Sequence, residues 1–427
     1  MIDIQLFREN PQIIRNSEEK RFKDPNAVDN VIELDNAWRK QRAAINELRR
    51  QRNELSKQIG QKKKQGLDAS EELQKADQIN KQIKEAENKA DQLLAERDKI
   101  RYSIGNLLHS SVPTAPDEEG NAIIRSWGEK RAFSFAPKHH ADLVMSLDVA
   151  DMEKAAQVAG ARTYYLKRDL VRLNLALIQL ALDVMTEKGY TPFWTPFFLR
   201  AEVMKGASEL ADLEQQLYKT DGDEFFFIAT SEQTLASLHW DEVLAPEMLP
   251  IRYVGISTCF RREAGTHGKD TKGIFRVHQF EKVEQFVFCK PEESWSIHEE
   301  MITNAEEIFQ KLEIPYRVAN IASGEMNDNA AKKYDIEAWF PAQEKYREVV
   351  SCSNCTDYQA RKMNIRMGKY GGEKEYAHTL NSTAIATERA ICAILENFQQ
   401  EDGSIDLPKS LWPYMGGRTK IESASTN

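Results

Sequence analysis

The chain has 427 residues, 41% of them hydrophobic and 29% charged, which is the composition of a folded protein with two or three domains. This excludes a single small module, a fibrous repeat and a disordered chain. The formal net charge of −9 gives no indication of a nucleic-acid partner. No apolar run reaches the roughly 18 residues that a membrane helix needs, and the start MIDIQLFREN lacks the apolar stretch of a secretory signal. We therefore expect a cytoplasmic protein without a membrane partner.

Residues 31–109 are nearly free of Gly and Pro and predict two long helices with a break between Gly60 and Asp68. In both helices, seam residues recur in alternating steps of three and four, the heptad pattern of a coiled coil. The pattern predicts an antiparallel hairpin that projects as an arm from a first domain, residues 1–112. The seam positions are Val31, Leu34, Trp38, Gln41, Ile45, Leu48, Arg52, Leu55 and Ile59, then Ala76, Ile79, Ile83, Ala86, Ala90, Leu93, Arg97, Ile100, Ile104 and Leu107.

The arm is the basic part of this acidic chain. Between residues 31 and 108, 17 Lys and Arg side chains stand against 13 Asp and Glu. Two interpretations are open. Coiled-coil surfaces are commonly laced with charged side chains that contact only water, whereas clustered cations without a base-reading code can bind a phosphate backbone. The candidates for phosphate contacts are Arg39, Arg42, Arg49, Arg50 and Lys57.

The second domain, residues 113–427, is predicted to be a mixed α and β body. Its most informative part is a pair of strands, 252–260 and 274–288, joined by a glycine-bearing loop, and this pattern predicts an antiparallel hairpin. Side chains alternate along a strand. We therefore expect one face of the hairpin to carry Arg261 and Glu263 from the first run and Arg276, His278, Phe280 and Glu284 from the second.

Such a face suits a nucleotide, because arginines bind phosphate, an aromatic ring stacks on the base and carboxylates accept from amino groups. The alternative is a solvated strand face without a ligand. The sequence contains neither GxxxxGK[ST] nor GxGxxG after a strand, so the phosphate-binding loops of the two commonest nucleotide folds are missing. Another arrangement must hold the phosphates.

These residues resemble the motifs of a known family. The run Phe260–Glu263, with Arg276 through Glu284, is similar to motif 2 of class II aminoacyl-tRNA synthetases. Residues 189–196, GYTPFWTP, resemble motif 1, and residues 381–389, NSTAIATER, resemble motif 3. Together with Thr230–Glu232, Glu348–Ser351 and the N-terminal arm, the chain resembles the seryl-tRNA synthetases in their archaeal and eukaryotic cytosolic form. One departure is that Ala384 and Glu388 stand where motif 3 commonly has glycine.

The resemblance implies an α+β fold, in which the coiled-coil hairpin precedes an antiparallel sheet flanked by helices, and it implies a homodimer. It implies that ATP and Mg²⁺ activate serine to seryl-adenylate, and that the seryl group passes to the 3′ end of tRNA(Ser). The arm would hold the long variable arm of this tRNA, and of the selenocysteine tRNA where one exists.

The resemblance also assigns site residues. It makes Arg261 and Arg389 catalytic, and Glu348 and Ser351 ligands of Mg²⁺. The implied ATP-binding residues are Arg261, Arg262, Glu263, Arg276, Val277, His278, Gln279, Phe280, Glu348, Val349, Val350, Ser351 and Arg389. The implied serine-binding residues are Thr230, Ser231, Glu232, Arg261, Glu284 and Asn381.

Two other functions are compatible with the sequence. One is a related ligase that loads a small amino acid onto a carrier protein, against which the basic arm argues. The other is a coiled-coil interaction protein with a relic synthetase body. The pair Cys352 and Cys355 forms a CxxC, but no second CxxC or His pair follows, so we expect neither a metal nor a redox role for it.

Overall fold

The computed structural model describes residues 1–209, 215–222, 224–263, 272–369 and 371–422. Contacts within the chain divide it into two compact units, residues 2–107 and residues 108–427 with Met1. The domain boundary that we expect at residue 112 stays a prediction. The glycine-bearing loop of the expected hairpin lies largely outside the described residues.

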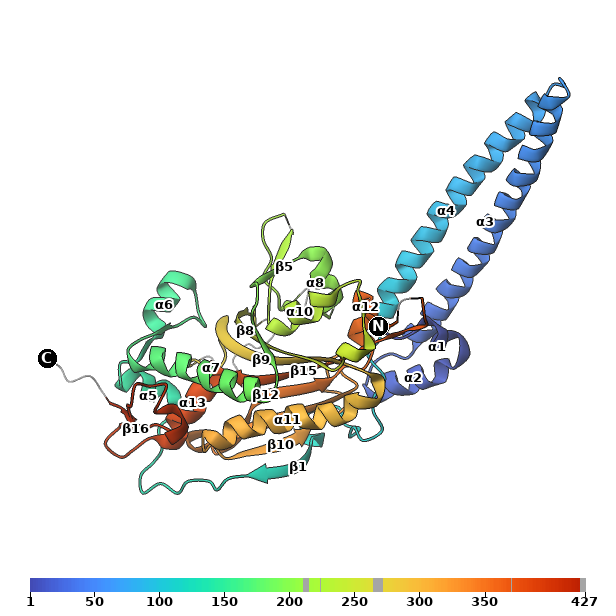
Figure 1. The fold of residues 1–427 in the computed structure, drawn as a ribbon. Helices are drawn as coiled ribbons and strands as arrows, with labels where there is room; N and C mark the ends of the chain where they lie inside the picture. Colours follow the sequence, from blue (N-terminus) through green and yellow to red (C-terminus); the bar gives the residue numbers. More distant parts are fainter. Residues whose placement is uncertain (210–214, 223, 264–271, 370, 423–427) are drawn as a thin grey trace. The chain divides into compact units, whose positions relative to one another are not determined.

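The first unit contains two short helices, α1 (Ile4–Glu9) and α2 (Pro11–Lys20), and the two long helices α3 (Asn26–Lys64) and α4 (Ser70–Ser103). The long helices run side by side as an antiparallel pair (Figure 1). The coiled-coil hairpin is thus confirmed, and at about 1.5 Å per residue α3 is roughly 58 Å long. The break is shorter than predicted, because Gly60 lies within α3 and the reversal takes only residues 65–69.

The seam positions are all buried or half-buried, with Val31, Ile45, Ile83 and Ala90 fully enclosed. The polar seam residue Arg97 is buried because it pairs with Asp35, whose other oxygen accepts from Arg8. Both distances are short, 2.8 Å for Arg97 and 2.7 Å for Arg8. Burial opposes the charge of Asp35, but the two guanidinium groups outweigh it and lower the pKa of this carboxyl group. The base of the arm is therefore fixed by a buried ion-pair network.

The second unit is built on one eight-stranded sheet with the order β1, β10, β11, β12, β15, β9, β8, β4. All neighbours are antiparallel except β4, which runs parallel to β8 at the sheet edge. The predicted antiparallel sheet is confirmed with this one exception. The strands are β1 (Ala122–Trp127), β4 (Thr191–Trp194), β8 (Ile251–Phe260), β9 (Gln279–Cys289), β10 (Tyr316–Asn320), β11 (Lys332–Phe340), β12 (Lys345–Asn354) and β15 (His378–Ala386).

Helices α7 (Asp169–Glu187), α11 (Ser294–Lys311) and α13 (Thr387–Phe398) pack against the sheet, and α7 and α11 bury the β9 face that carries Val283 and Val287 (Figure 1). The opposite face of β9 carries Lys282 and Glu284. It is covered in part by α10 (Ser231–Ala236), which approaches Gly255 so closely that a Cβ there would lie 2.8 Å from Leu235. Farther along β9, Phe286 and Phe288 are buried in a second hydrophobic cluster with Met363. The part of this face around Lys282 and Glu284 forms the floor of the site.

Smaller elements complete the second unit. They are α5 (His140–Ser146), α6 (Met152–Ala159), α8 (Ala201–Ala207) and α12 (Tyr358–Met363), with the short strands β2 (Ala150–Asp151), β3 (Tyr165–Leu166), β5 (Phe198–Arg200), β6 (Phe225–Phe227), β7 (Val243–Leu244), β13 (Arg366–Gly368), β14 (Lys374–Tyr376), β16 (Ile405–Asp406) and β17 (Lys420–Ile421). Among the described residues, no helix is both long enough and apolar enough to span a bilayer.

Candidate active site

A cavity of about 230 Å³ opens on the free face of the sheet. Its lining includes ten of the residues that the sequence singles out: Thr230, Glu232, Arg261, Phe280, Glu284, Glu348, Val349, Ser351, Asn381 and Arg389. It also includes six that sequence reasoning missed: Lys282, Asn327, Lys333, Ser353, Thr383 and Ala386. We call this space the activation cavity.

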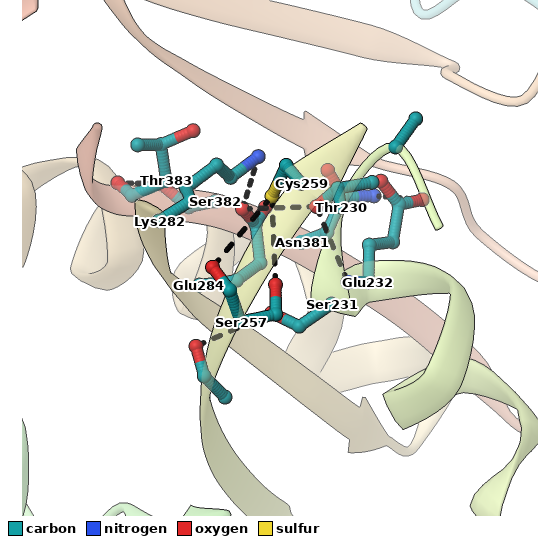
Figure 2. A network of polar contacts seen from close by, with 12 residues as sticks. Thr230, Ser231, Glu232, Ser257, Cys259, Lys282, Glu284, Asn381, Ser382 and Thr383 are labelled. Atoms are coloured by element: carbon teal, nitrogen blue, oxygen red, sulfur yellow. Dashed lines mark hydrogen bonds and ion pairs between the residues drawn. The ribbon is translucent and has the colours of Figure 1, made fainter. Parts of the chain in front are cut away.

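One end of the activation cavity is built around two carboxylates (Figure 2). Glu284 is only 1% exposed and accepts a hydrogen bond from the Thr230 hydroxyl at 3.3 Å. Glu232 accepts from the amides of Asn381, at 3.0 Å, and Gln359, at 2.7 Å. Fixed carboxylates of this kind suit a small ligand that carries an ammonium and a hydroxyl group.

Lys282 forms an ion pair with Glu284 beneath this end of the cavity. Burial, together with the positive charge of Arg261, lowers the pKa of Lys282 to about 8. The signal for Lys282 was present in the sequence, because it lies between Phe280 and Glu284 at the period of two that marks one strand face. Ser231, in contrast, points out of the cavity and donates its hydroxyl to the Gly255 carbonyl at 3.2 Å.

Arg261 directly follows β8 and lines both the activation cavity and a neighbouring cavity of about 320 Å³. Its backbone N–H donates to the His278 carbonyl at 2.9 Å, and its Nε donates to the Ala229 carbonyl at 3.2 Å. The guanidinium carbon lies 5.2 Å from the centre of the Phe280 ring. A planar cation held in this way can present its remaining N–H groups to an anion above the ring.

The expected strand face is wrong in part. Strand β9 begins only at Gln279, so Arg276 and His278 precede it, and the His278 ring contacts the Arg261 carbonyl at 2.8 Å instead of facing the cavity. β8 ends at Phe260, and Glu263 has a φ of +52°, so strand alternation no longer applies to it. Glu263 and Arg276 nevertheless meet in a 3.0 Å ion pair that lines the neighbouring cavity.

Five residues of the expected ATP set line neither cavity. Arg262 and Gln279 are exposed, Val277 and Val350 belong to the hydrophobic core, and His278 has the backbone contact described above. Their participation stays a prediction.

The spacing of Glu348 and Ser351 would place them on opposite faces of a regular strand. A β-bulge in β12 brings the two side chains to the same face. Ile336 pairs with Val350 and Glu337 pairs with Glu348, so Val349 is an extra residue in the strand. A second bulge at Ala384 shifts the register between Thr383 and Ile385 on β15. The two bulges turn Glu348, Ser351, Thr383 and Ala386 toward the same cavity.

Arg389 lies in the first turn of α13, with its side chain 14% exposed. Its Nη1 donates to the Glu348 carbonyl at 3.0 Å and to the Glu348 carboxylate at 3.1 Å. Partial desolvation opposes the charge of Glu348, whose side chain is 49% exposed, but Arg389, Lys333 and Arg261 outweigh it and lower the pKa of this carboxyl group. Three cations therefore surround one ionised carboxylate at this end of the activation cavity.

Ala384 and Glu388, which replace the common glycines of motif 3, both lie in buried positions beside the cavity. Ala384 is the fully buried extra residue of the second bulge. Glu388 is 3% exposed, and burial raises its pKa to about 7 although Arg389 lies 3.9 Å away. Glu388 is thus enclosed behind the site, where it adds no obstruction to the cavity.

Two other groups of possible metal ligands lie in the described part of the chain. Cys352 and Cys355 are buried free thiols. His139, His140 and Glu396 lie close enough to hold an ion. Nδ1 of His140 already contacts Glu396 at 2.8 Å, however, and His139 caps α5 by accepting from the Ala141 N–H.

Comparison with known proteins adds a decisive observation. Residues 1–108 match the seryl-tRNA synthetase N-terminal domain, and residues 215–398 match the class II tRNA synthetase core domain (G, H, P, S and T). The serine–tRNA ligase of Methanosphaera stadtmanae is 53% identical over 424 residues, which cover 99% of this chain and 100% of that protein. The chain belongs to the seryl-tRNA synthetase family.

Solved structures of the family share the whole fold. The seryl-tRNA synthetase from Pyrococcus horikoshii, complexed with ATP, matches with a TM-score of 0.93 at 47% identity over 100% of both chains. The cytoplasmic serine–tRNA ligase from Naegleria fowleri, in complex with AMP, matches with a TM-score of 0.88 at 41% identity, covering 100% of this chain and 99% of that one. The chain is therefore a class II ligase that activates serine with ATP and charges tRNA, which favours this function over the carrier-protein ligase and the relic.

Proposed function

We propose that serine and ATP meet in the activation cavity, with serine at the Glu232 and Glu284 end and the phosphates at the Arg261 and Arg389 end. The observation that supports this assignment is that carboxylates gather at one end of the cavity and arginines at the other. The carboxylates of one end, of which Glu284 is buried and Glu232 half-buried, match the serine ammonium and hydroxyl groups, and the cations of the other end match phosphate oxygens.

In the proposed reaction, a serine carboxylate oxygen attacks the α-phosphorus of ATP. The new bond joins this oxygen to phosphorus, the bond from the α-phosphorus to the bridging oxygen breaks, and pyrophosphate leaves. No proton has to move, because the carboxylate is already ionised. Arg261 aligns the carboxylate with the α-phosphate, and Phe280 supports the adenine, while Arg389 neutralises the distal phosphates. The ribose hydroxyl at the 3′ end of tRNA(Ser) then takes the seryl group, and AMP leaves.

Glu348 and Ser351 fit a magnesium ion. The bulge at Val349 places a carboxylate and a hydroxyl oxygen on one cavity face, and both are the hard oxygen ligands that Mg²⁺ prefers. One carboxylate oxygen of Glu348 is engaged by Arg389, which fixes its direction. When bound there, Mg²⁺ would neutralise phosphate charge.

The basic arm is proposed to hold tRNA(Ser), and the selenocysteine tRNA where one exists. All five candidate cations are exposed, but they differ in their surroundings. Arg49 pairs with Glu87 at 2.6 Å, and Arg50 pairs with Glu47 and Glu54 at 2.8 Å. No ion-pair partner is present for Arg39, Arg42 or Lys57 in the described part of the chain. These three are the stronger candidates for phosphate contacts.

A homodimer is proposed through the motif 1 region. Strand β4 forms a sheet edge, and α7 packs beside it. Three large apolar side chains are exposed on these two elements, Trp194 by 73%, Leu175 by 60% and Val171 by 43%. An edge strand with such neighbours is a surface that a second copy can cover.

A cytoplasmic location is proposed because a relative from Arabidopsis thaliana, 49% identical over 98% of this chain and 96% of that protein, is a cytoplasmic serine–tRNA ligase.

Shortening the arm tests the division of labour between the two units. We would replace residues 42–93 by a short Gly/Ser turn, which keeps the buried pair of Asp35 and Arg97. Serine-dependent pyrophosphate exchange should persist, because the activation cavity contains no residue from the arm. Charging of tRNA(Ser) should collapse. Loss of exchange in a protein that is still folded would show that the arm takes part in activation.

A further inference from the structure

Gln359 is a buried polar residue in contact with the serine end of the activation cavity, and the proposed roles give it no function. It lies on α12 between Tyr358 and Ala360, and all three residues are 0% exposed. A buried amide costs free energy unless hydrogen bonds satisfy it. A helix that only packed against its neighbours could carry an apolar residue at this position.

Both ends of the Gln359 amide are hydrogen-bonded. Its Nε2 donates to Oε1 of Glu232 at 2.7 Å, and its Oε1 accepts from the hydroxyl group of Thr379 at 2.8 Å. An ionised carboxylate accepts hydrogen bonds but cannot donate them, so the amide has to present its NH₂ group to Glu232 and its oxygen to Thr379. The Thr379 hydroxyl therefore sets the direction in which the amide points.

Strand β15 reaches Glu232 by two routes. Asn381 donates directly to the same carboxylate oxygen, Oε1 of Glu232, at 3.0 Å (Figure 2). Thr379 lies two positions earlier on β15 and so shares its face of the strand, but it reaches Glu232 only through Gln359. Two donors that reach one carboxylate oxygen from α12 and β15 restrict the rotation of the carboxylate.

The main chain of Glu232 is fixed as well. Glu232 lies in the first turn of α10, where its backbone N–H donates to the Thr230 hydroxyl at 3.3 Å. With the main chain and one oxygen held, the other oxygen keeps a constant direction relative to the cavity that Glu232 lines. A carboxylate with a constant direction binds an ammonium group better than one that rotates, because less conformational freedom is lost on binding.

We propose that Gln359, oriented by Thr379, is a positioning residue that holds the Glu232 carboxylate in the direction in which it binds the serine ammonium group. This inference rests on the proposed placement of serine at the Glu232 end of the activation cavity. Gln359 acts only through Glu232 and touches neither serine nor ATP.

The test separates serine binding from ATP binding. We would measure the KM for serine, the KM for ATP and kcat in serine-dependent pyrophosphate exchange, together with Tm, for Gln359→Met, Thr379→Val and the double variant. Gln399→Met is the matched control, because Gln399 follows α13, is 1% exposed and also has both amide ends hydrogen-bonded, in its case to backbone groups. Glu232→Gln is the reference for loss of the proposed ammonium contact.

Gln359→Met should raise the serine KM on the order of 10-fold, the effect of one lost hydrogen bond to a charged group, while the ATP KM changes little. Thr379→Val should raise the serine KM by roughly 3-fold, because the hydroxyl acts through the amide. The double variant should be no worse than Gln359→Met alone, since without the amide the hydroxyl has nothing to orient. Gln399→Met should lower Tm but leave the serine KM unchanged.

An unchanged serine KM in Gln359→Met, or equal rises of the serine and ATP KM, would overturn the positioning role. Additive effects of the two substitutions would show that Thr379 does not act through Gln359, which also contradicts the proposal. A matching rise in the serine KM of Gln399→Met would make the effect one of general destabilisation. If Gln359→Met does not fold, Thr379→Val, which keeps the shape of the side chain, decides, and an unchanged serine KM in that variant contradicts the proposal.

The reference variant distinguishes this inference from the proposed function. If Glu232→Gln too left the serine KM unchanged, the proposed placement of serine itself would fail. A raised serine KM in Glu232→Gln alone would refute only the role of Gln359.

Discussion

Replacing Lys282 by Met removes the cation from a buried ion pair and leaves Glu284, which is only 1% exposed, without its partner. Breaking one side of such a pair costs about 3–5 kcal/mol of folding free energy. For a unit of this size, each kcal/mol lowers the melting temperature by roughly 1.5 °C. We therefore expect Lys282→Met to lower Tm by about 4–8 °C.

The double variant Lys282→Met with Glu284→Gln separates the pair from its surroundings. Removing both charges leaves no buried ion, so the double variant should be more stable than the two single losses added together. The difference should be up to about 3 kcal/mol, the range for residues in contact. Additive losses would refute the claim that the two side chains stabilise each other.

The same pair should control serine recognition. We expect Glu284→Gln and Lys282→Met to lower kcat/KM for serine on the order of 10- to 100-fold in pyrophosphate exchange, because the carboxylate loses its charge or its position. The KM for ATP should change little. The charged fraction of Lys282 falls as the pH rises through its pKa of about 8, so the serine KM of the unaltered protein should increase above that pH. Lys282→Arg should remove this alkaline limb; a limb that persists would exclude Lys282 as its cause.

Three further predictions test other parts of the site and the arm. Arg261→Lys keeps the positive charge but loses the planar guanidinium, so the rate of serine activation should fall on the order of 10²-fold. Arg262→Lys, at an exposed position, should leave this rate nearly unchanged. Equal losses in the two variants would exclude the proposed role of Arg261 in aligning the serine carboxylate. Glu348→Gln should shift the Mg²⁺ dependence of activation to higher concentration, and an unshifted midpoint would exclude direct ligation. Arg42→Ala and Lys57→Ala should each weaken tRNA binding and lower by about 0.9 the slope of log affinity against log salt concentration. Arg50→Ala should have a smaller effect, because two glutamates already hold the Arg50 guanidinium. Identical effects of the three variants would contradict the distinction between paired and unpaired cations.

The arm was predictable because the heptad pattern of a coiled coil can be recognised within each helix alone. The heptad steps identified the buried side of both helices, but both helix ends were misjudged. Gly60 lies within α3, since glycine is tolerated in a helix at a modest cost, and α4 ends at Ser103, before the predicted seam positions Ile104 and Leu107. Arg97 in the seam was also visible. Its partner Asp35, however, lies 62 residues away in the sequence and is identified only by the packing of the two helices.

The sequence predicted which residues form the site better than it predicted the directions of their side chains. Family motifs named ten of the cavity residues, yet the facing of Glu348 and Ser351 depends on a bulge that arises from pairing with β11. Simple alternation also failed for Arg276 and His278, because β9 starts later than its β-rich sequence suggests. Lys333 was missed for a different reason: its place in the cavity follows from strand order, which no local pattern records.

If the activation cavity joins serine to AMP, the purified protein must catalyse serine-dependent pyrophosphate exchange. Exchange should be measured without tRNA for serine, alanine, threonine and glycine at equal concentration. We expect exchange with serine, and far less with alanine and glycine, which leave the Glu232 and Glu284 carboxylates without a hydroxyl partner. Comparable exchange with alanine or glycine, or none with serine in the folded protein, would contradict this expectation.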